Sequence, residues 1–206
     1  MLTQHVVIFA KQPRMGRIKT RLASDIGTVN AWRFYSKTLT MLVNRVSTND
    51  RWQTYIAATP DHTILRDYAQ PVRSNNSIRL INQGSGDLGQ RMERVFKSLP
   101  PGPVIIIGAD IPDIRNHHIK QAFKILGYQD CVFGPAHDGG YWLVGFKRRP
   151  RLPKLFKNVR WSTEHALSDT LSGLPEKMQI GMVERLNDID TAADLKPMAK
   201  NGPSKI

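Results

Sequence analysis

The chain has 206 residues, of which 40% are hydrophobic and 23% are charged, as is usual for one globular domain with a sizeable core. No apolar stretch approaches the ~20 residues that cross a bilayer, the first residues lack the pattern of a signal peptide, and a single cysteine excludes an internal disulfide. The formal net charge of +13 indicates an anionic partner, and the lone cysteine fits a cytoplasmic location.

Apolar runs alternate with amphipathic segments along the whole chain. Strands are predicted at residues 5–10, 52–59, 78–82, 104–109, 131–133, 141–146 and 179–186. Helices are predicted at residues 29–46, 88–99, 119–126 and 163–171, with a last one from residue 191. This alternation predicts a single three-layer α/β/α domain over residues 1–199, with a mostly parallel central sheet. The polar residues 200–206 are predicted to form a loose tail.

A basic loop follows the first predicted strand. No acidic residue precedes Asp25, whereas five cations lie between that strand and Asp25. Because the loop leaves a strand and leads into a helix, its free backbone N–H groups face the carboxyl edge of the sheet. Lys19 and Arg21, together with Lys11 and Gly16, form a candidate phosphate-binding site in this loop. A basic surface loop without a ligand is the alternative interpretation.

The most apolar predicted strand, at residues 104–109, ends at Asp110 and is stopped by Pro112. A run of β-branched residues without alternation is typical of a central strand that is covered on both faces. Ligands bind at the carboxyl edge of such sheets, so Asp110 is a candidate ligand for Mg²⁺ or Mn²⁺ held against phosphate oxygens. The same carboxylate could instead cap the next helix or complete a turn.

A glycine-rich segment at residues 84–89 follows the third predicted strand. Its spacing matches the dinucleotide-binding fingerprint, which leaves a nicotinamide-dependent oxidoreductase as an alternative function. That fingerprint normally follows the first strand of its fold, so we favour a turn that delivers Asp87 and Arg91 to the mouth of the phosphate site. Asp87 also suits a helix N-cap, with Gln90 in the capping-box position.

Two further segments place carboxylates in turns. Asp138 precedes two glycines, which let the backbone approach a ligand closely, and it is a candidate catalytic group with turn formation as the alternative. Asp190, Thr191 and Asp194 are explained by the capping of the last helix. This explanation leaves Asp188 without a local role, so Asp188 is a candidate second metal ligand.

A second basic stretch runs from Lys147 to Arg160 and contains no acidic residue. With the aromatic residues Phe146, Phe156 and Trp161, it could bind nucleic acid through charge and base stacking. The same aromatics fit strand and core positions, and the cations fit a solvated surface. Nucleic acid is therefore the less favoured partner.

Seven short motifs span nearly the whole chain. They are FAK at residues 9–11, GRIKTRL at 16–22, GDLGQRM at 86–92, GADIP at 108–112, GPAHDGGY at 134–141, WST at 161–163 and DIDT at 188–191. In this order they resemble the DUF2064 family of glycosyltransferase-like proteins, also labelled transferase 1 associated with radical-SAM and selenium domains. The combination is specific, although the single motifs are not.

The resemblance implies the nucleotide-diphospho-sugar transferase (GT-A) fold. Relatives of that fold include guanylyltransferases of molybdenum-cofactor and deazaflavin-cofactor assembly. The resemblance further implies that Lys19 and Arg21 hold nucleotide phosphates and that Asp110 holds the metal. It makes Asp138 a candidate second ligand or catalytic group.

Two residues depart from the family pattern. Ala109 and Ile111 flank Asp110 where the family often has hydroxyl residues, which leaves the acceptor open. We expect a metal-dependent transferase that uses a nucleotide or nucleotide-sugar donor and a small-molecule acceptor. The reaction is either nucleotidyl or glycosyl transfer, and a catalytically inactive GT-A scaffold that binds nucleotide is the alternative.

Overall fold

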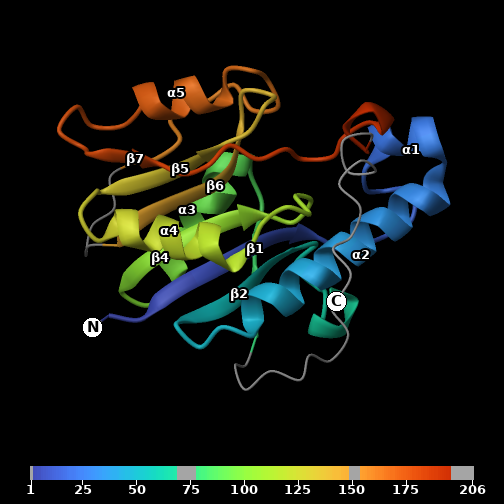
Figure 1. The fold of residues 1–206 in the computed structure, drawn as a ribbon, viewed down its shortest axis with the longest axis horizontal. Coiled ribbons are helices and arrows are strands. Elements are labelled where there is room, and N and C mark those ends of the chain that lie inside the picture. The colour runs from blue at the N-terminus through green and yellow to red at the C-terminus, as the bar shows by residue number, and fades with distance from the viewer. Residues whose placement is uncertain (1, 69–77, 149–153, 196–206) are drawn as a thin grey trace.

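The computed structural model describes residues 2–68, 78–148 and 154–195 (Figure 1). The predicted tail at residues 200–206 and residues 149–153 of the second basic stretch lie outside the described residues. The described strands form one seven-stranded sheet in the order β3-β2-β1-β4-β6-β5-β7. Their bounds are β1 (Gln4–Lys11), β2 (Trp52–Thr59), β3 (Arg79–Asn82), β4 (Gly102–Gly108), β5 (Cys131–Pro135), β6 (Tyr141–Arg148) and β7 (Ile180–Met182).

The sheet is mostly parallel, as the sequence predicted. β1 pairs in parallel with β2 on one side and with β4 on the other, and β2 pairs in parallel with β3. β6 runs antiparallel to both of its neighbours, β4 and β5, whereas β7 is parallel to β5. The carboxyl ends of β1 and β4 therefore lie side by side, and the loops that follow them can build one site.

Helices cover both faces of the sheet (Figure 1). They are α1 (Thr20–Ile26), α2 (Thr28–Ser47), α3 (Leu88–Ser98), α4 (Asn116–Leu126) and α5 (Ala166–Ser172). α2 and α4 pack on one face, against strand residues such as Ile8 and Ile107. α3 and α5 pack on the other face, against residues such as Val7 and Ile106. Because successive strand residues point to opposite faces, the unbroken apolar runs of β1 and β4 supply both layers of the core.

Two short helical elements were not predicted, α1 and the 3₁₀ helix η1 (Leu65–Asp67). α1 has seven residues and its only buried side chain is Leu22, so it is too short to show a periodic apolar pattern. The last predicted helix does occur, and its described part covers residues 192–195.

The strand predicted at residues 179–186 is shorter than expected. β7 pairs with β5 over three residues at the edge of the sheet, and Leu186 adds only an isolated bridge to Ala136. Val183 and Leu186 are nevertheless buried. The apolar pattern therefore predicts burial correctly here, although Val183 and Leu186 lie outside the hydrogen-bonded pairing of β7 with β5.

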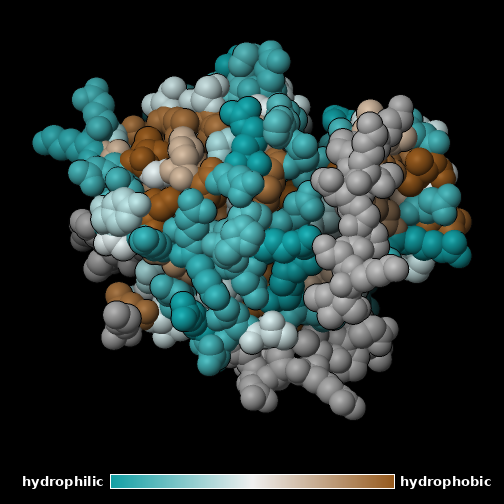
Figure 2. Space-filling model, in the orientation of Figure 1, coloured by the Kyte–Doolittle hydropathy of each residue, from teal (hydrophilic) through white to brown (hydrophobic). Residues whose placement is uncertain are grey.

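Hydrophilic side chains cover most of the face shown in Figure 2, with apolar side chains gathered near β7 and near α1. On β7 the exposed apolar residues are Ile180 and Met182, with 38% and 43% of their surface accessible. Among the described residues, no helix is both long enough and apolar enough to cross a membrane.

Candidate functional site

A cavity of about 430 Å³ opens at the carboxyl edge of β1 and β4, which is large enough for a small ligand. Its charged and polar lining consists of Lys11, Arg17, Lys19, Thr20, Arg21, Tyr35, Gln83, Arg91, Asp110 and Asp190. Its apolar lining includes Phe9, Leu88, Met92, Ile106 and Tyr141. Five of the residues predicted for the site, Lys11, Lys19, Arg21, Arg91 and Asp110, thus lie around one cavity.

Lys19 makes the closest charge contacts in this cavity. Its ammonium nitrogen lies 2.7 Å from Asp110 Oδ2 and 2.6 Å from Asp190 Oδ1, and only 6% of its side chain is exposed. Burial of the side chain lowers the pKa of Lys19, but the two carboxylates outweigh burial and the net shift is upward. Lys19 is therefore protonated, and its positive charge lies beside Asp110, just after β4.

The backbone at Lys19 is left-handed, with φ 45° and ψ 48°, at the N-cap of α1. A residue with a Cβ adopts this conformation at an energetic cost, and such residues are frequent at functional sites. The loop reaches this point through Gly16, whose φ of +75° is accessible to glycine without strain. Gly16 itself is not among the residues that line the cavity.

The end of β1 is held by Tyr35 of α2. The Tyr35 hydroxyl accepts a hydrogen bond from the backbone N–H of Lys11 and donates one to the carbonyl of the same residue. Burial, with the Asp110 carboxylate as a smaller cause, raises the pKa of Tyr35, so its hydroxyl stays protonated at neutral pH. The start of the basic loop is thus fixed to the helical layer.

Four carboxylates gather at the site. Burial, followed by the charges of Asp110, Asp138 and Asp190, raises the pKa of Asp188 to about 6, so each of these three carboxylates lies close enough to act on Asp188. Asp138 is oriented by a hydrogen bond of 2.9 Å from the backbone N–H of Gly140 to its Oδ1. Asp138 and Asp188 do not line the cavity itself but contribute to its electrostatic field.

Lys19 and Arg21 form ion pairs with these carboxylates. Arg21 lies 3.5 Å from Asp190 Oδ2, and 72% of its side chain is exposed. The same cavity is lined by three further cations, Lys11, Arg17 and Arg91. Carboxylate oxygens such as those of Asp110 are the ligands that a hard divalent cation such as Mg²⁺ or Mn²⁺ prefers. The residues present therefore fit the metal that the GT-A resemblance implies.

Gln83 holds Arg91 in place at the cavity wall. The buried Gln83 amide donates hydrogen bonds to the carbonyls of Ala10 and Ala57 at 3.2 and 2.8 Å. Its side-chain oxygen accepts a hydrogen bond of 2.9 Å from Arg91 Nη1. The guanidinium of Arg91 is thereby tied to the ends of β1 and β2.

Asp87 has a structural task. Its carboxylate accepts the backbone N–H of Gln90 at 2.8 Å, and the Gln90 side chain accepts the N–H of Asp87 at 3.0 Å, which completes the predicted capping box. Asp87 does not line the cavity. The glycines before it form a turn after β3, at the edge of the sheet, whereas the dinucleotide fingerprint belongs to a central first strand.

Sequence reasoning missed Asp190, Gln83 and Tyr35 as residues of the cavity. Asp190 or Thr191 was predicted as the helix cap; Thr191 is the residue directly before the helix, and Asp194 in its first turn accepts the N–H groups of Asp190 and Thr191. The pairing of Asp190 with Lys19 joins residues 171 positions apart. A local pattern holds no signal for such a contact.

The second basic stretch gives little support to nucleic-acid binding. Phe146 and Phe156, two of its three candidate stacking groups, are 1% and 8% exposed and belong to the core around α3. Arg160 forms two hydrogen bonds of 2.8 Å with the carboxylate of Asp169. In the described part of this stretch, the aromatics thus stabilise the fold.

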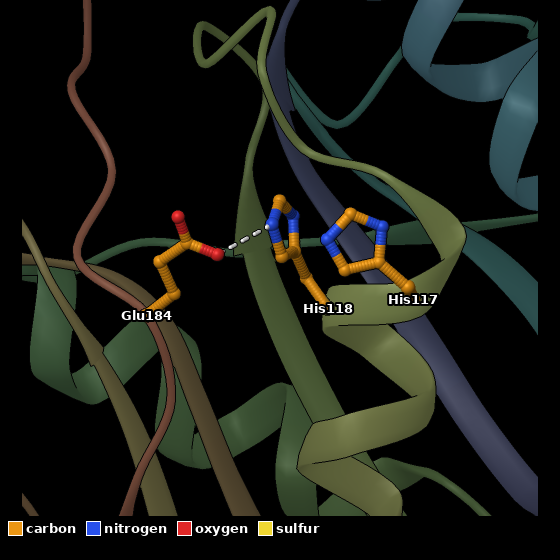
Figure 3. A group of neighbouring side chains, drawn as sticks. All are labelled: His117, His118 and Glu184. Carbon is orange, nitrogen blue, oxygen red and sulfur yellow. Dashed lines mark hydrogen bonds and ion pairs between the residues drawn. The ribbon is translucent and has the colours of Figure 1, made fainter.

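A second cluster of ionisable side chains lies away from the cavity lining. Among the described residues, His117, His118 and Glu184 bring potential metal-binding atoms within 4.8 Å of one another (Figure 3). His118 is buried, and its Nε2 lies 3.2 Å from Glu184 Oε2. Its Nδ1 accepts a hydrogen bond of 3.0 Å from the backbone N–H of Arg115.

The hydrogen bonds of His118 argue against a metal at this cluster. A backbone N–H can only donate, so Nδ1 carries the single nitrogen lone pair of a neutral imidazole and Nε2 carries the proton. A metal-bound histidine has the opposite arrangement, in which the nitrogen that does not bind the metal donates its proton. Glu184 is also held at its carbonyl by Trp142 Nε1, at 2.9 Å. The cluster therefore anchors the segment between β7 and Asp188.

Comparison with known proteins places the chain in a family. The family described as "Uncharacterized protein conserved in bacteria (DUF2064)" matches residues 42–163, which is more than half of the chain. The chain therefore belongs to this family, as its motifs predicted. The matched range contains Asp110 and Asp138, whereas Lys19 and Asp188 lie outside it.

One curated relative supports a link to nucleotide transfer. A 2-phospho-L-lactate guanylyltransferase from Methanocaldococcus vulcanius is 26% identical over 73 residues, which are 35% of this chain and 33% of that protein. The chain thus aligns with about a third of the length of this relative.

Solved structures show the fold. A protein from Desulfovibrio desulfuricans G20, provisionally assigned as a nucleotide-diphospho-sugar transferase, aligns with 98% of this chain and 90% of its own, with a TM-score of 0.82 and 24% identity. A mannosyltransferase from Pyrobaculum calidifontis in complex with GDP-Man and Mn²⁺ aligns with 90% of this chain and 56% of its own, with a TM-score of 0.51 and 11% identity. The fold is thus that of nucleotide-diphospho-sugar transferases.

Proposed function

We propose that this protein is a cytoplasmic, metal-dependent transferase that moves a nucleotidyl group from a nucleoside triphosphate to an anionic small-molecule acceptor. One observation carries the proposal: a lysine lies between two carboxylates at the edge of a cavity that also holds three arginines. The guanylyltransferase relative favours nucleotidyl transfer among the reactions of this fold.

The cavity offers different surfaces to the two ends of a nucleotide. The apolar wall, which includes Phe9, Leu88 and Tyr141, suits the ring of a nucleobase. Lys11 and Arg91 belong to the basic part of the cavity lining, which suits the phosphates. We therefore place the base against the apolar wall and the phosphates toward the basic loop.

Asp110 and Asp188, with Asp190 beside them, are the residues that would hold Mg²⁺ or Mn²⁺. When bound, such a cation neutralises negative charge on the phosphate oxygens and on the diphosphate that leaves. The place of Asp110 at the cavity edge and its electrostatic coupling to Asp188 support this assignment. The manganese complex of the mannosyltransferase neighbour is in keeping with it.

In the proposed reaction, an anionic oxygen of the acceptor attacks the α-phosphorus. A new P–O bond forms, the bond from the α-phosphorus to the β-bridging oxygen breaks, and pyrophosphate leaves with the bonding electrons. Lys19 and Arg21 stabilise the charge that develops on the pyrophosphate. Asp138, whose carboxylate is oriented by Gly140, faces the acceptor and accepts a proton if the acceptor is a hydroxyl group.

Glycosyl transfer is the second candidate, and the structural likeness to the Desulfovibrio protein favours it. In that reaction the acceptor attacks a sugar carbon and a nucleoside diphosphate leaves. The same cations stabilise the leaving group in both reactions, so the products distinguish them.

A ligand screen followed by product analysis tests the proposal. Nucleoside triphosphates and nucleotide sugars, each with and without Mn²⁺, are compared for the rise in melting temperature that ligand binding to the folded state produces. The ligand that binds is then incubated with a panel of phosphorylated and hydroxylated acceptors. Pyrophosphate release supports nucleotidyl transfer, and release of a nucleoside diphosphate supports glycosyl transfer. Tight binding without turnover across the panel identifies an inactive scaffold.

A further inference from the structure

The ammonium of Lys19 occupies the carboxylates that the proposed function gives to a metal ion. Its nitrogen contacts one oxygen of Asp110 and one of Asp190 at 2.7 and 2.6 Å, and its charge also acts on Asp188. With 6% of its side chain exposed, this lysine is enclosed by the carboxylates rather than stretched toward solvent. The protein thus supplies its own cation to this site.

A divalent cation and this ammonium compete for the same oxygens. Mg²⁺ and Mn²⁺ bind carboxylate oxygens at about 2.0 to 2.3 Å, closer than the ammonium does, and two positive charges on one pair of carboxylates repel each other. The phosphates of a nucleotide change this balance, because they give the lysine other oxygens to bind.

We propose that Lys19 makes the binding of the divalent cation and of the nucleotide interdependent: it neutralises Asp110 and Asp190 in the free protein and transfers its ammonium to the phosphates when the nucleotide arrives. The inference rests on the proposed function and adds to it the order in which the nucleotide and the cation bind. The free protein binds the cation weakly, and the nucleotide makes the carboxylates accessible. Lys19 stays protonated throughout, so the exchange needs no proton transfer.

The position of Lys19 in the chain permits this movement. It lies at the N-cap of α1 in a left-handed conformation, at the end of a loop rather than within a helix. No heavy atom lies within 4 Å of the position that a Cβ would take at Gly16 in the same loop. Ile18, directly before Lys19, is buried in the core, so the movement is one of the long, flexible Lys19 side chain, with the core left in place.

Arg21 provides a matched control. It carries the same charge as Lys19 and contacts the same residue, Asp190, but at 3.5 Å and with 72% of its side chain exposed. If positive charge alone weakens the binding of the divalent cation, neutralising Lys19 or Arg21 raises the cation affinity equally. If the contact of the ammonium with the carboxylate oxygens matters, neutralising Lys19 raises the affinity more.

The test measures Mn²⁺ binding to the full chain by calorimetry, with and without a nucleoside triphosphate whose α–β bridge resists cleavage. We expect Lys19→Met to raise the Mn²⁺ affinity of the nucleotide-free protein about tenfold, within the usual range of coupling between sites, and Arg21→Met to raise it about twofold or less. The analogue raises the Mn²⁺ affinity of the wild type and has a much smaller effect in Lys19→Met. Lys19→Gln is measured alongside, so that a folding defect of one variant does not decide the result.

The inference is overturned if both Lys19 variants bind Mn²⁺ no better than the wild type, or if Arg21→Met gains as much affinity. The proposed function has a separate readout in the same experiment. If the wild type binds Mn²⁺ and the analogue together and Asp110→Asn does not, the metal site stands whatever Lys19 does. If the wild type binds neither, both proposals fail.

Discussion

Two clusters of ionisable side chains follow strands at the same edge of the sheet, yet they differ in what they can bind. Around Lys19, the carboxylates of Asp110 and Asp190 are paired with the side chains of Lys19 and Arg21, which other ions can replace, and their charge acts on Asp188. At His118, the ring nitrogens are both engaged, one by the Arg115 N–H and one by Glu184. Donor atoms within reach of one another therefore do not define a metal site, because the lone pairs of those atoms must also be available to the metal.

The pKa shifts express the same difference. At the first cluster, burial, followed by the charges of neighbouring carboxylates, raises the pKa of Asp188 to about 6, so the charged form of Asp188 is disfavoured unless a cation is near. At the second cluster, burial, followed by the charge of His117, lowers the pKa of His118 and keeps its ring neutral. The first cluster gains from an added cation, whereas the second does not need one.

The largest effect is expected from Asp110. Asp110→Asn removes the charge at the end of β4 that the transfer reaction uses, so we expect turnover to fall by about a hundredfold or more while the melting temperature changes little. Steady-state rates measured with Mn²⁺ and the best donor check this expectation. Asp113→Asn, which changes an exposed carboxylate of the same loop, is the control and should keep its activity. Full metal-dependent activity in Asp110→Asn would show that the carboxylate cluster is not the reaction site.

The next effect concerns the nucleotide. Lys19→Ala removes a charge-assisted contact to the phosphates, for which we expect a loss of nucleotide affinity of about tenfold to a hundredfold. Calorimetric titration with the donor measures it, and Lys120→Ala, an exposed lysine on α4, serves as the comparison. An unchanged affinity in Lys19→Ala removes Lys19 from the nucleotide site.

A smaller effect is expected at the second cluster, on stability rather than activity. His118→Ala removes the acceptor for the Arg115 N–H and the contact to Glu184, at a cost of about 1 to 2 kcal/mol in the free energy of unfolding. His118→Asn retains an acceptor near the cap and should lose less. Denaturant unfolding of both variants measures the difference, and equal losses contradict the capping role.

The lowered pKa of His118 also gives stability a dependence on pH. The folded state disfavours the charged ring, so between the folded and unfolded pKa values the unfolded chain binds more protons. The contribution of His118 is therefore complete above pH ~6.5 and is lost as the pH falls below that value. Unfolding free energies of the wild type and His118→Asn, measured at pH 7.5 and pH 5.5, should show the smaller decrease in the variant. The same decrease in both proteins assigns the pH dependence to other groups.

No effect on metal binding is expected from a substitution of His117. His117→Ala should leave the affinity for Zn²⁺ and Mn²⁺ unchanged, since the tautomer of its neighbour His118 does not allow a shared metal. Titration of His117→Ala and of the wild type with Zn²⁺ and with Mn²⁺ measures this. One equivalent of tightly bound Zn²⁺ that disappears in His117→Ala would mean that the second cluster is a metal site after all.

The sequence was sufficient to predict the fold because its signals are local. The unbroken apolar run of β4 and the boundary at Pro112 predicted a central strand over residues 104–109 with Asp110 directly after it. The structure confirms the central position, and the strand ends at Gly108, two residues before Asp110. The capping box at Asp87 was predicted from four neighbouring residues and is present. Patterns of this kind depend on contacts within one element, which the sequence contains.

The candidate site was less accessible to prediction, because its contacts join distant parts of the chain. Asp190 looked like a helix cap, and only the folded chain shows that its carboxylate faces Lys19. The buried Gln83 gave no sign that it fixes Arg91. The predicted roles of Lys11, Gly16, Asp138 and the other site residues stay predictions until a ligand is bound.

A crystal structure of the chain with Mn²⁺ and a non-cleavable nucleoside triphosphate tests the central claim most directly, because manganese is located by its anomalous scattering. The account predicts one manganese peak bound by Asp110 and Asp188, with the Lys19 ammonium on the phosphates. Phosphates bound elsewhere, with Lys19 still between Asp110 and Asp190 and no manganese beside them, would contradict it.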